Sequence, residues 1–95
     1  MTSSPGLTPR LRRHLLRTFG VGFDDALAVM ETAADHRGQP PNERCAAAIV
    51  FAASGDLAKL GRMADLLAVD FRDVLVAGGV ANVDWPYRID ELLGP

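Results

Sequence analysis

The residue types that could carry out covalent or acid–base chemistry are few in this sequence. Cys45 is the only cysteine, and it would need His14 or His36 as a base in order to act as a nucleophile. Cys45 stands near the start of the most apolar segment of the chain, where a cysteine usually fills the core. We therefore expect Cys45 to be a core residue.

Asp35 and His36, with Glu31 one helical turn earlier, could place a carboxylate pair near an imidazole. Their spacing matches no zinc-ligand pattern, so we interpret them as a solvated helix end and expect no metal. The glycines at 20–22 and 78–79 lack the strand that precedes a phosphate-binding loop, and they are expected to end helices. These features predict that the chain is not an enzyme and binds no cofactor.

Positive charge gathers near the N-terminus. Arg10, Arg13 and Arg17 are spaced three and four residues apart, which places them on one face of a helix, whereas Arg12 falls among the apolar residues. Guanidinium groups on one face can pair with phosphates or with an acidic protein, and the alternative is an ordinary solvated face. The candidate partner-binding residues are Arg10, Arg12, Arg13, Arg17, Arg72 and Trp85.

Apolar residues recur at helical spacing along most of the chain, and helix-capping residues separate the segments. The expected helices run from Thr8–Pro9 to Phe19, from Phe23 to Gly38 and from Glu43 to Ala53, and three more begin after the N-caps Asp56, Asp70 and Asp84. The segment 43–53 is apolar almost all the way round and rich in alanine, so it should lie at the centre. The predicted fold is all-α, a compact bundle of five to six short helices around this helix.

The length of 95 residues suits one domain, predicted over residues 8–95, with residues 1–7 as a disordered tail. The longest apolar run, residues 45–53, is too short to cross a bilayer, and no secretory signal pattern is present, so we expect no membrane association. The single cysteine favours a reducing cytoplasm. The excess of arginine over lysine and the abundant alanine indicate a GC-rich bacterial source.

The segment 63–75 resembles a bacterial helix-turn-helix. Ala64, Leu67, Val69 and Val74 match the packing positions of that motif, and Ala68 stands where its turn glycine is usual. The resemblance implies DNA binding, but the second helix would present Arg72 together with acids at 70 and 73, and acids repel phosphates. Nucleic acid is therefore the less favoured partner.

A wider pattern, Gly-Asp-Leu-x-Lys-Leu at 55–60 followed by Asp-Phe-Arg-Asp-Val-Leu at 70–75, resembles small uncharacterised bacterial helical proteins. This resemblance implies a helical layout in which Asp70, Arg72 and Asp73 form a structural corner between neighbouring helix ends. It identifies no catalytic residue in this chain. The favoured function is a small cytoplasmic bacterial protein that binds another protein without catalysis, of which an immunity or antitoxin role would be one instance. The alternative is a helix-turn-helix transcriptional regulator. The sequence leaves the oligomeric state open.

Overall fold

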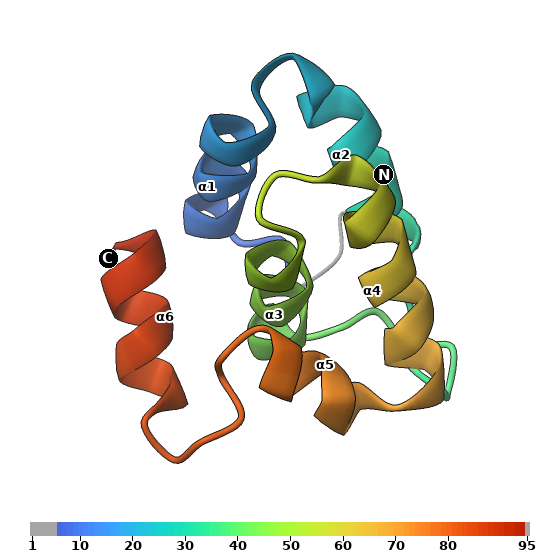
Figure 1. The fold of residues 1–95 in the computed structure, drawn as a ribbon, viewed down its shortest axis with the longest axis vertical. Coiled ribbons are helices and arrows are strands. Elements are labelled where there is room, and N and C mark those ends of the chain that lie inside the picture. Colours follow the sequence, from blue (N-terminus) through green and yellow to red (C-terminus); the bar gives the residue numbers. More distant parts are fainter. Residues whose placement is uncertain (1–5, 95) are drawn as a thin grey trace.

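The computed structural model describes residues 6–94, and it is all-α over that range, as the sequence predicts (Figure 1). The helices are α1 (Pro9–Phe19), the short 3-10 helix η1 (Gly20–Gly22), α2 (Phe23–Thr32), α3 (Glu43–Ala53), α4 (Leu57–Val69), α5 (Phe71–Ala77) and α6 (Trp85–Leu93). No helix within residues 6–94 is both long enough and apolar enough to span a membrane.

Helix α3 forms the centre of the bundle, and its predicted bounds are confirmed. The Asn42 side chain caps its N-terminus by accepting a hydrogen bond from the backbone N–H of Cys45 at 2.9 Å. Seven of its eleven residues are buried, five of them alanines. Because alanine side chains are short, α1, α4, α5 and α6 all pack against α3 (Figure 1).

The packed domain begins earlier than the sequence predicts. Leu7 is only 5% exposed and belongs to the core, and Gly6 is also buried. A Cβ atom on Gly6 would lie 2.4 Å from the carbonyl oxygen of Pro41, so the chain touches the start of α3 before α1 begins. The prediction that residues 6 and 7 belong to a disordered tail is therefore wrong, and the rest of that tail, residues 1–5, lies outside the described residues.

Helix α2 ends six residues before the predicted Gly38. Ala33, its C-cap, has an extended backbone with ψ at 138°. The Asp35 carboxylate then accepts hydrogen bonds from the backbone N–H groups of Arg37 at 2.8 Å and Gln39 at 3.0 Å. A short aspartate side chain that binds nearby backbone donors stabilises a turn in place of a helix. Asp35 and His36 consequently lie in a loop, and their predicted place at a helix end is wrong.

Helices α4 and α5 meet at a sharp corner where Asp70 alone separates them. Its carboxylate accepts the backbone N–H of Arg72 at 3.0 Å and so caps α5. The helix-turn-helix prediction places a turn at Ala68, but α4 continues through this residue to Val69, which is 81% exposed. The predicted packing role of Val69 is wrong, whereas Ala64, Leu67 and Val74 are buried as expected.

Arg10 links three distant parts of the chain. Its guanidinium pairs with Glu43 at the start of α3, with an Nη2 to Oε1 distance of 2.6 Å, and with Asp90 on α6, also at 2.6 Å. It also donates to the carbonyl oxygen of Gly94 at 3.1 Å. Arg10 therefore ties α6 and α3 to α1, and its predicted place on a solvated arginine face is corrected.

Glu43→Gln should weaken this linkage in a pH-dependent way. The hydrogen bond from Arg10 holds the pKa of the Glu43 carboxyl below its ordinary value of 4.5. A lowered pKa in the folded state adds stability that is present above pH 4.5 and is lost as the pH falls through the lowered pKa. At neutral pH we expect the variant to lose about 1 to 2 kcal/mol in urea unfolding, and this difference should shrink as the pH falls below 4.5 through the lowered pKa. Glu91→Gln, at an exposed position on α6, is the control, and a loss independent of pH would contradict the assignment.

Helix α6 packs beside α1 and α3 (Figure 1). Ile89 and Leu93 are buried, and Trp85 is half-buried against the core. The guanidinium of Arg44 lies 4.6 Å from the centre of the Trp85 ring, and its Nε donates to the carbonyl oxygen of Val80 at 3.0 Å. Trp85 thus anchors α6 to α3, and Tyr87, at 78% exposed, is the outward-facing aromatic residue of this segment.

Candidate functional site

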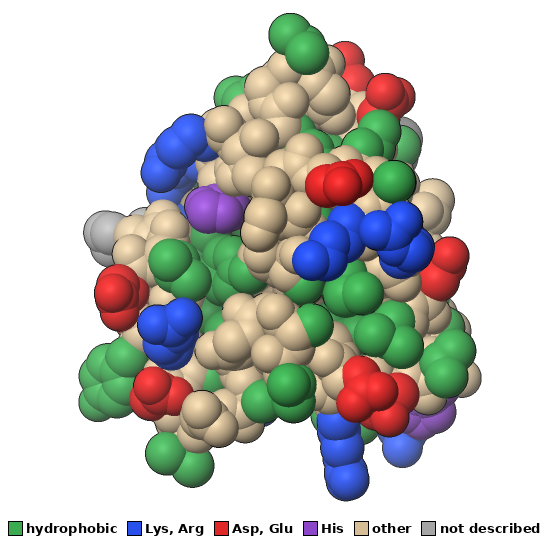
Figure 2. All heavy atoms as spheres, viewed as in Figure 1, with side chains coloured by type: hydrophobic (Ala, Val, Ile, Leu, Met, Phe, Trp, Pro, Cys, Tyr) green, Lys and Arg blue, Asp and Glu red, His purple; other side chains and the backbone are tan. Residues whose placement is uncertain are grey.

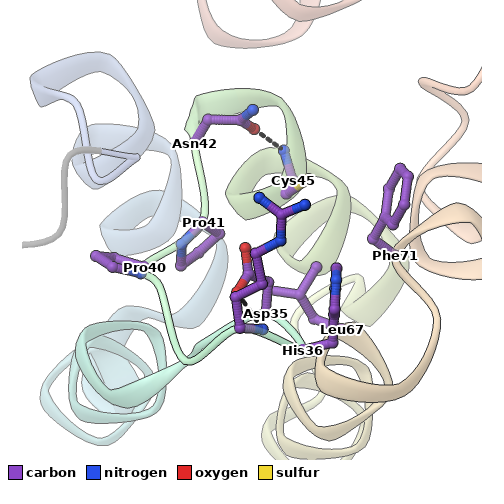
Figure 3. A pocket seen from close by; sticks show the side chains of 9 residues that line it. Asp35, His36, Pro40, Pro41, Asn42, Cys45, Leu67 and Phe71 are labelled. Carbon is purple, nitrogen blue, oxygen red and sulfur yellow. Dashed lines mark hydrogen bonds between the residues drawn. The ribbon is translucent and has the colours of Figure 1, made fainter.

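A pocket of about 310 Å³ opens between the loop 33–42 and the helices α3, α4 and α5 (Figure 3). Its lining residues are Asp35, His36, Arg37, Pro40, Pro41, Asn42, Cys45, Leu67 and Phe71. We call this the corner pocket, because Phe71 opens α5 just after the α4–α5 corner. Its volume is at the lower end of the range of small-molecule sites and suits one large side chain.

Much of the wall of the corner pocket is apolar. Leu67 contributes from α4 and is almost fully buried, and the prolines of the loop contribute from the opposite side (Figure 3). Phe71 stands at the edge and is 40% exposed. An aromatic ring that lines a pocket and is also partly exposed to water has apolar surface available to a ligand.

Two polar side chains of the pocket are engaged within the protein. The Oδ1 atom of Asp35 receives two backbone N–H groups of its own loop, and the Oδ1 atom of Asn42 receives the N–H of Cys45 (Figure 3). The Asp35 bonds hold the turn of the loop, and the Asn42 bond joins the end of the loop to the start of α3. Asp35 and Asn42 therefore shape the pocket, and their Oδ1 atoms already accept hydrogen bonds from within the protein.

The corner pocket brings together Cys45, Asp35 and His36, the residues with which a cysteine nucleophile or an acid–base pair could be built. Cys45 is half-buried, so the expectation that it belongs wholly to the core is only partly met. Burial raises the pKa of the Cys45 thiol, and the negative charge of Asp35 raises it further against the opposing effect of Arg44. Within residues 6–94, Cys45 Sγ has no hydrogen bond to His36 or Asp35. The thiol is therefore protonated at neutral pH, which is the reverse of an activated nucleophile.

Cys45 should react slowly with iodoacetamide in the folded protein. Because the thiolate is the reactive form, the raised pKa should move the rise in rate to a pH above the ordinary value of 9.0. Relative to the same chain in urea, we expect the rate at neutral pH to fall by at least about tenfold. Mass spectrometry of the alkylated chain over time measures both rates. A folded-state rate equal to or faster than the unfolded rate would show an activated thiol.

The predicted partner-binding residues do not gather in the corner pocket. Arg72 is exposed beside it, with its guanidinium 5.9 Å from the centre of the Phe71 ring. Arg12 is half-buried on α1, as its mixed position on the helix suggests, and Arg13 and Arg17 are exposed on the same helix. On the face drawn in Figure 2, basic side chains alternate with acidic and apolar ones. The arginines therefore form no uniform basic surface on this face.

Sequence reasoning missed six contributors to the pocket: Arg37, Pro40, Pro41, Asn42, Leu67 and Phe71. The adjacent prolines indicate a break between helices. Because proline restricts the backbone, a loop that ends in two prolines is one signal that a surface hollow beside it has a fixed shape. Nothing in the sequence predicted that this loop lies beside the α4–α5 corner, because the contact joins segments that are about thirty residues apart in the chain.

The fold and the corner pocket together define a small all-α protein with an apolar-walled surface hollow held by a fixed loop. The chain matches no family model, no curated protein and no solved structure.

Proposed function

We propose that this chain is a non-enzymatic protein-interaction module that receives an apolar side chain of a partner protein in the corner pocket. The observation that carries the proposal is the half-exposed Phe71 at the edge of an apolar-walled pocket. Aromatic and aliphatic anchors seated in such pockets usually dominate the energy of a protein interface. A protonated, half-buried thiol in the same pocket supports binding in preference to nucleophilic catalysis.

The surface around the pocket supports the same proposal. Val69, at the end of α4, is 81% exposed, and Val76, on α5, is 66% exposed. These side chains leave apolar surface exposed on the two helices that contribute Leu67 and Phe71 to the pocket. Arg72, between them in the chain, would contribute to the rim of that contact, where charges set specificity more than affinity.

The wider description rests on composition. A small bacterial protein of the cytoplasm fits the single lysine among ten basic residues and the single cysteine. An immunity or antitoxin protein, which acts by binding another protein, would be one instance of such a module. For the DNA-binding alternative, the missing turn at Ala68 and the exposed acids at 70 and 73 offer no support.

The proposal is tested by photo-crosslinking in lysate of a GC-rich bacterium treated with nuclease. A benzophenone side chain is placed at the exposed Val69, which lies two positions along the chain from both Leu67 and Phe71 of the pocket lining, and in a second sample at Val21, which is fully exposed in η1. We expect a specific protein adduct from position 69 and not from position 21. Phe71→Ala should then weaken binding of that purified protein by at least about tenfold, whereas Val21→Ala should not change it.

Two outcomes would overturn the proposal. One is an adduct partner whose affinity for the chain is the same with Phe71→Ala as with the unchanged sequence, provided that circular dichroism shows the same helix content. The other is an adduct that forms only in a parallel lysate without nuclease and falls steeply with salt, which would instead support the DNA-binding regulator.

A further inference from the structure

A second hollow, of about 440 Å³, lies where α1, α3 and α6 meet. Its lining residues are His14, Thr18, Val50, Phe51, Ser54, Gly78, Arg88 and Leu92. On the left of Figure 2, where Figure 1 places α1 and α6, a histidine lies beside recessed apolar side chains, with basic and acidic side chains around them. We call this hollow the α1–α6 pocket, and it is separate from the corner pocket.

The polar groups of the α1–α6 pocket are cationic or neutral, and none of its eight lining residues is an acid. The side chain of Arg88 forms no ion pair with any residue from 6 to 94, in contrast to Arg10, which is fully paired. Its Nη2 atom stands 3.6 Å from where a Cβ atom of Gly79 would lie, so it reaches over the end of α5. An unpaired guanidinium at a pocket without acids favours a negatively charged ligand.

The remaining polar side chains leave Arg88 as the dominant recognition group. The hydroxyl groups of Thr18 and Ser54 donate to backbone carbonyl oxygens of their own helices, at 2.7 Å and 3.2 Å. His14 packs edge-to-face on Phe51 at 5.4 Å, and its buried Nδ1 has no hydrogen-bond partner among the described residues. Burial and the nearby charge of Arg17 lower the pKa of His14, so its imidazole is neutral at neutral pH.

The rest of the lining is apolar and comes from two helices. Val50 and Phe51 belong to α3, and Leu92 belongs to α6, where it is 39% exposed. A leucine left partly open beside a buried valine and a phenylalanine offers apolar surface next to the guanidinium. This combination fits a ligand with an apolar body and one anionic end.

We propose that the α1–α6 pocket binds a small aliphatic or aryl carboxylic acid. Arg88 pairs with the carboxylate, the neutral imidazole of His14 lies beside the ligand, and Phe51 and Leu92 contact its apolar body. The guanidinium suits this anion because its fork of N–H groups matches the two carboxylate oxygens. The site is independent of the partner protein proposed above.

Solution NMR of the labelled chain tests the proposal, with hexanoate as the probe. We expect saturable shifts of the His14 imidazole and the Leu92 methyl groups, with a dissociation constant on the order of 1 mM. Hexanamide, which lacks the charge, and inorganic phosphate, which lacks the apolar body, should each bind at least about tenfold more weakly. Shifts that never saturate at His14 and Leu92, or equal binding of hexanamide or phosphate, would overturn the proposal.

Variants assign the binding groups. Arg88→Gln should weaken hexanoate binding by at least about tenfold, and Arg62→Gln, at an exposed position on α4 outside this pocket, should leave it unchanged. Leu92→Glu places a negative charge in the hollow and should abolish binding, whereas Val83→Glu, at a residue that is outside the pocket and 97% exposed, should not. Hexanoate affinity unchanged in both pocket variants would exclude this hollow as the site.

Discussion

Gly78→Ala should destabilise the folded chain by about 3 kcal/mol, because α5 and α3 touch at this position. A Cβ atom on Gly78 would lie 2.5 Å from the Cα and 2.6 Å from the carbonyl oxygen of Ala48. These are backbone atoms of the central helix, so the contact cannot be relieved by rotating a side chain. Chemical denaturation followed by circular dichroism measures the loss.

Gly61→Ala is the matched control for this prediction. Gly61 lies inside α4, and nothing stands within 4 Å of the position that its Cβ atom would take. The same substitution should therefore stabilise the chain by up to about 1 kcal/mol, because alanine is the better helix former. If both variants were equally stable, the close approach of α5 to α3 would be refuted.

Ile49→Ala should cost about 3 to 4 kcal/mol, since it removes the largest side chain that α3 buries completely. The neighbouring residues of α3 are mainly alanines, which are too short to fill the space that is left. The cost therefore includes a cavity as well as the lost transfer of apolar surface. Urea unfolding gives the free energy.

Val83→Ala serves as the comparison for Ile49→Ala, because Val83 is 97% exposed in the segment between α5 and α6. Its replacement should change the free energy of unfolding by less than about 0.5 kcal/mol. A loss below about 1 kcal/mol for Ile49→Ala would mean that α3 is not the centre of the core.

Local signals in the sequence predicted much of the fold correctly. Thr8 with Pro9, and Asp56, each mark a helix start by chemistry that involves only neighbouring residues. The structure places both caps where these signals predict them. Local chemistry also misled at two points. The helical spacing after Phe23 continues past Thr32, where the Asp35 turn takes over. Asp84, the predicted N-cap of the last helix, makes no side-chain capping hydrogen bond.

The candidate sites depended on contacts between distant residues, which the sequence does not reveal. Arg10 has the spacing of a solvated arginine face, but its partners Glu43 and Asp90 lie 33 and 80 positions away. The corner pocket likewise needs the loop 33–42 to meet α4 and α5. Cys45 and Asp35 could be named as chemically capable residues, yet the charge and burial that make the thiol unreactive follow only from the packed structure.

The most direct test of a partner seated in the corner pocket is the alkylation rate of Cys45 with and without the partner captured at position 69. Cys45 is the only cysteine of the chain and lines the pocket, so its rate reports on occupancy of that hollow. With the partner at saturating concentration, we predict that iodoacetamide modifies Cys45 at least about tenfold more slowly than in the free protein. An unchanged rate in the saturated complex would show that the partner binds elsewhere, and it would contradict the proposed function of this pocket.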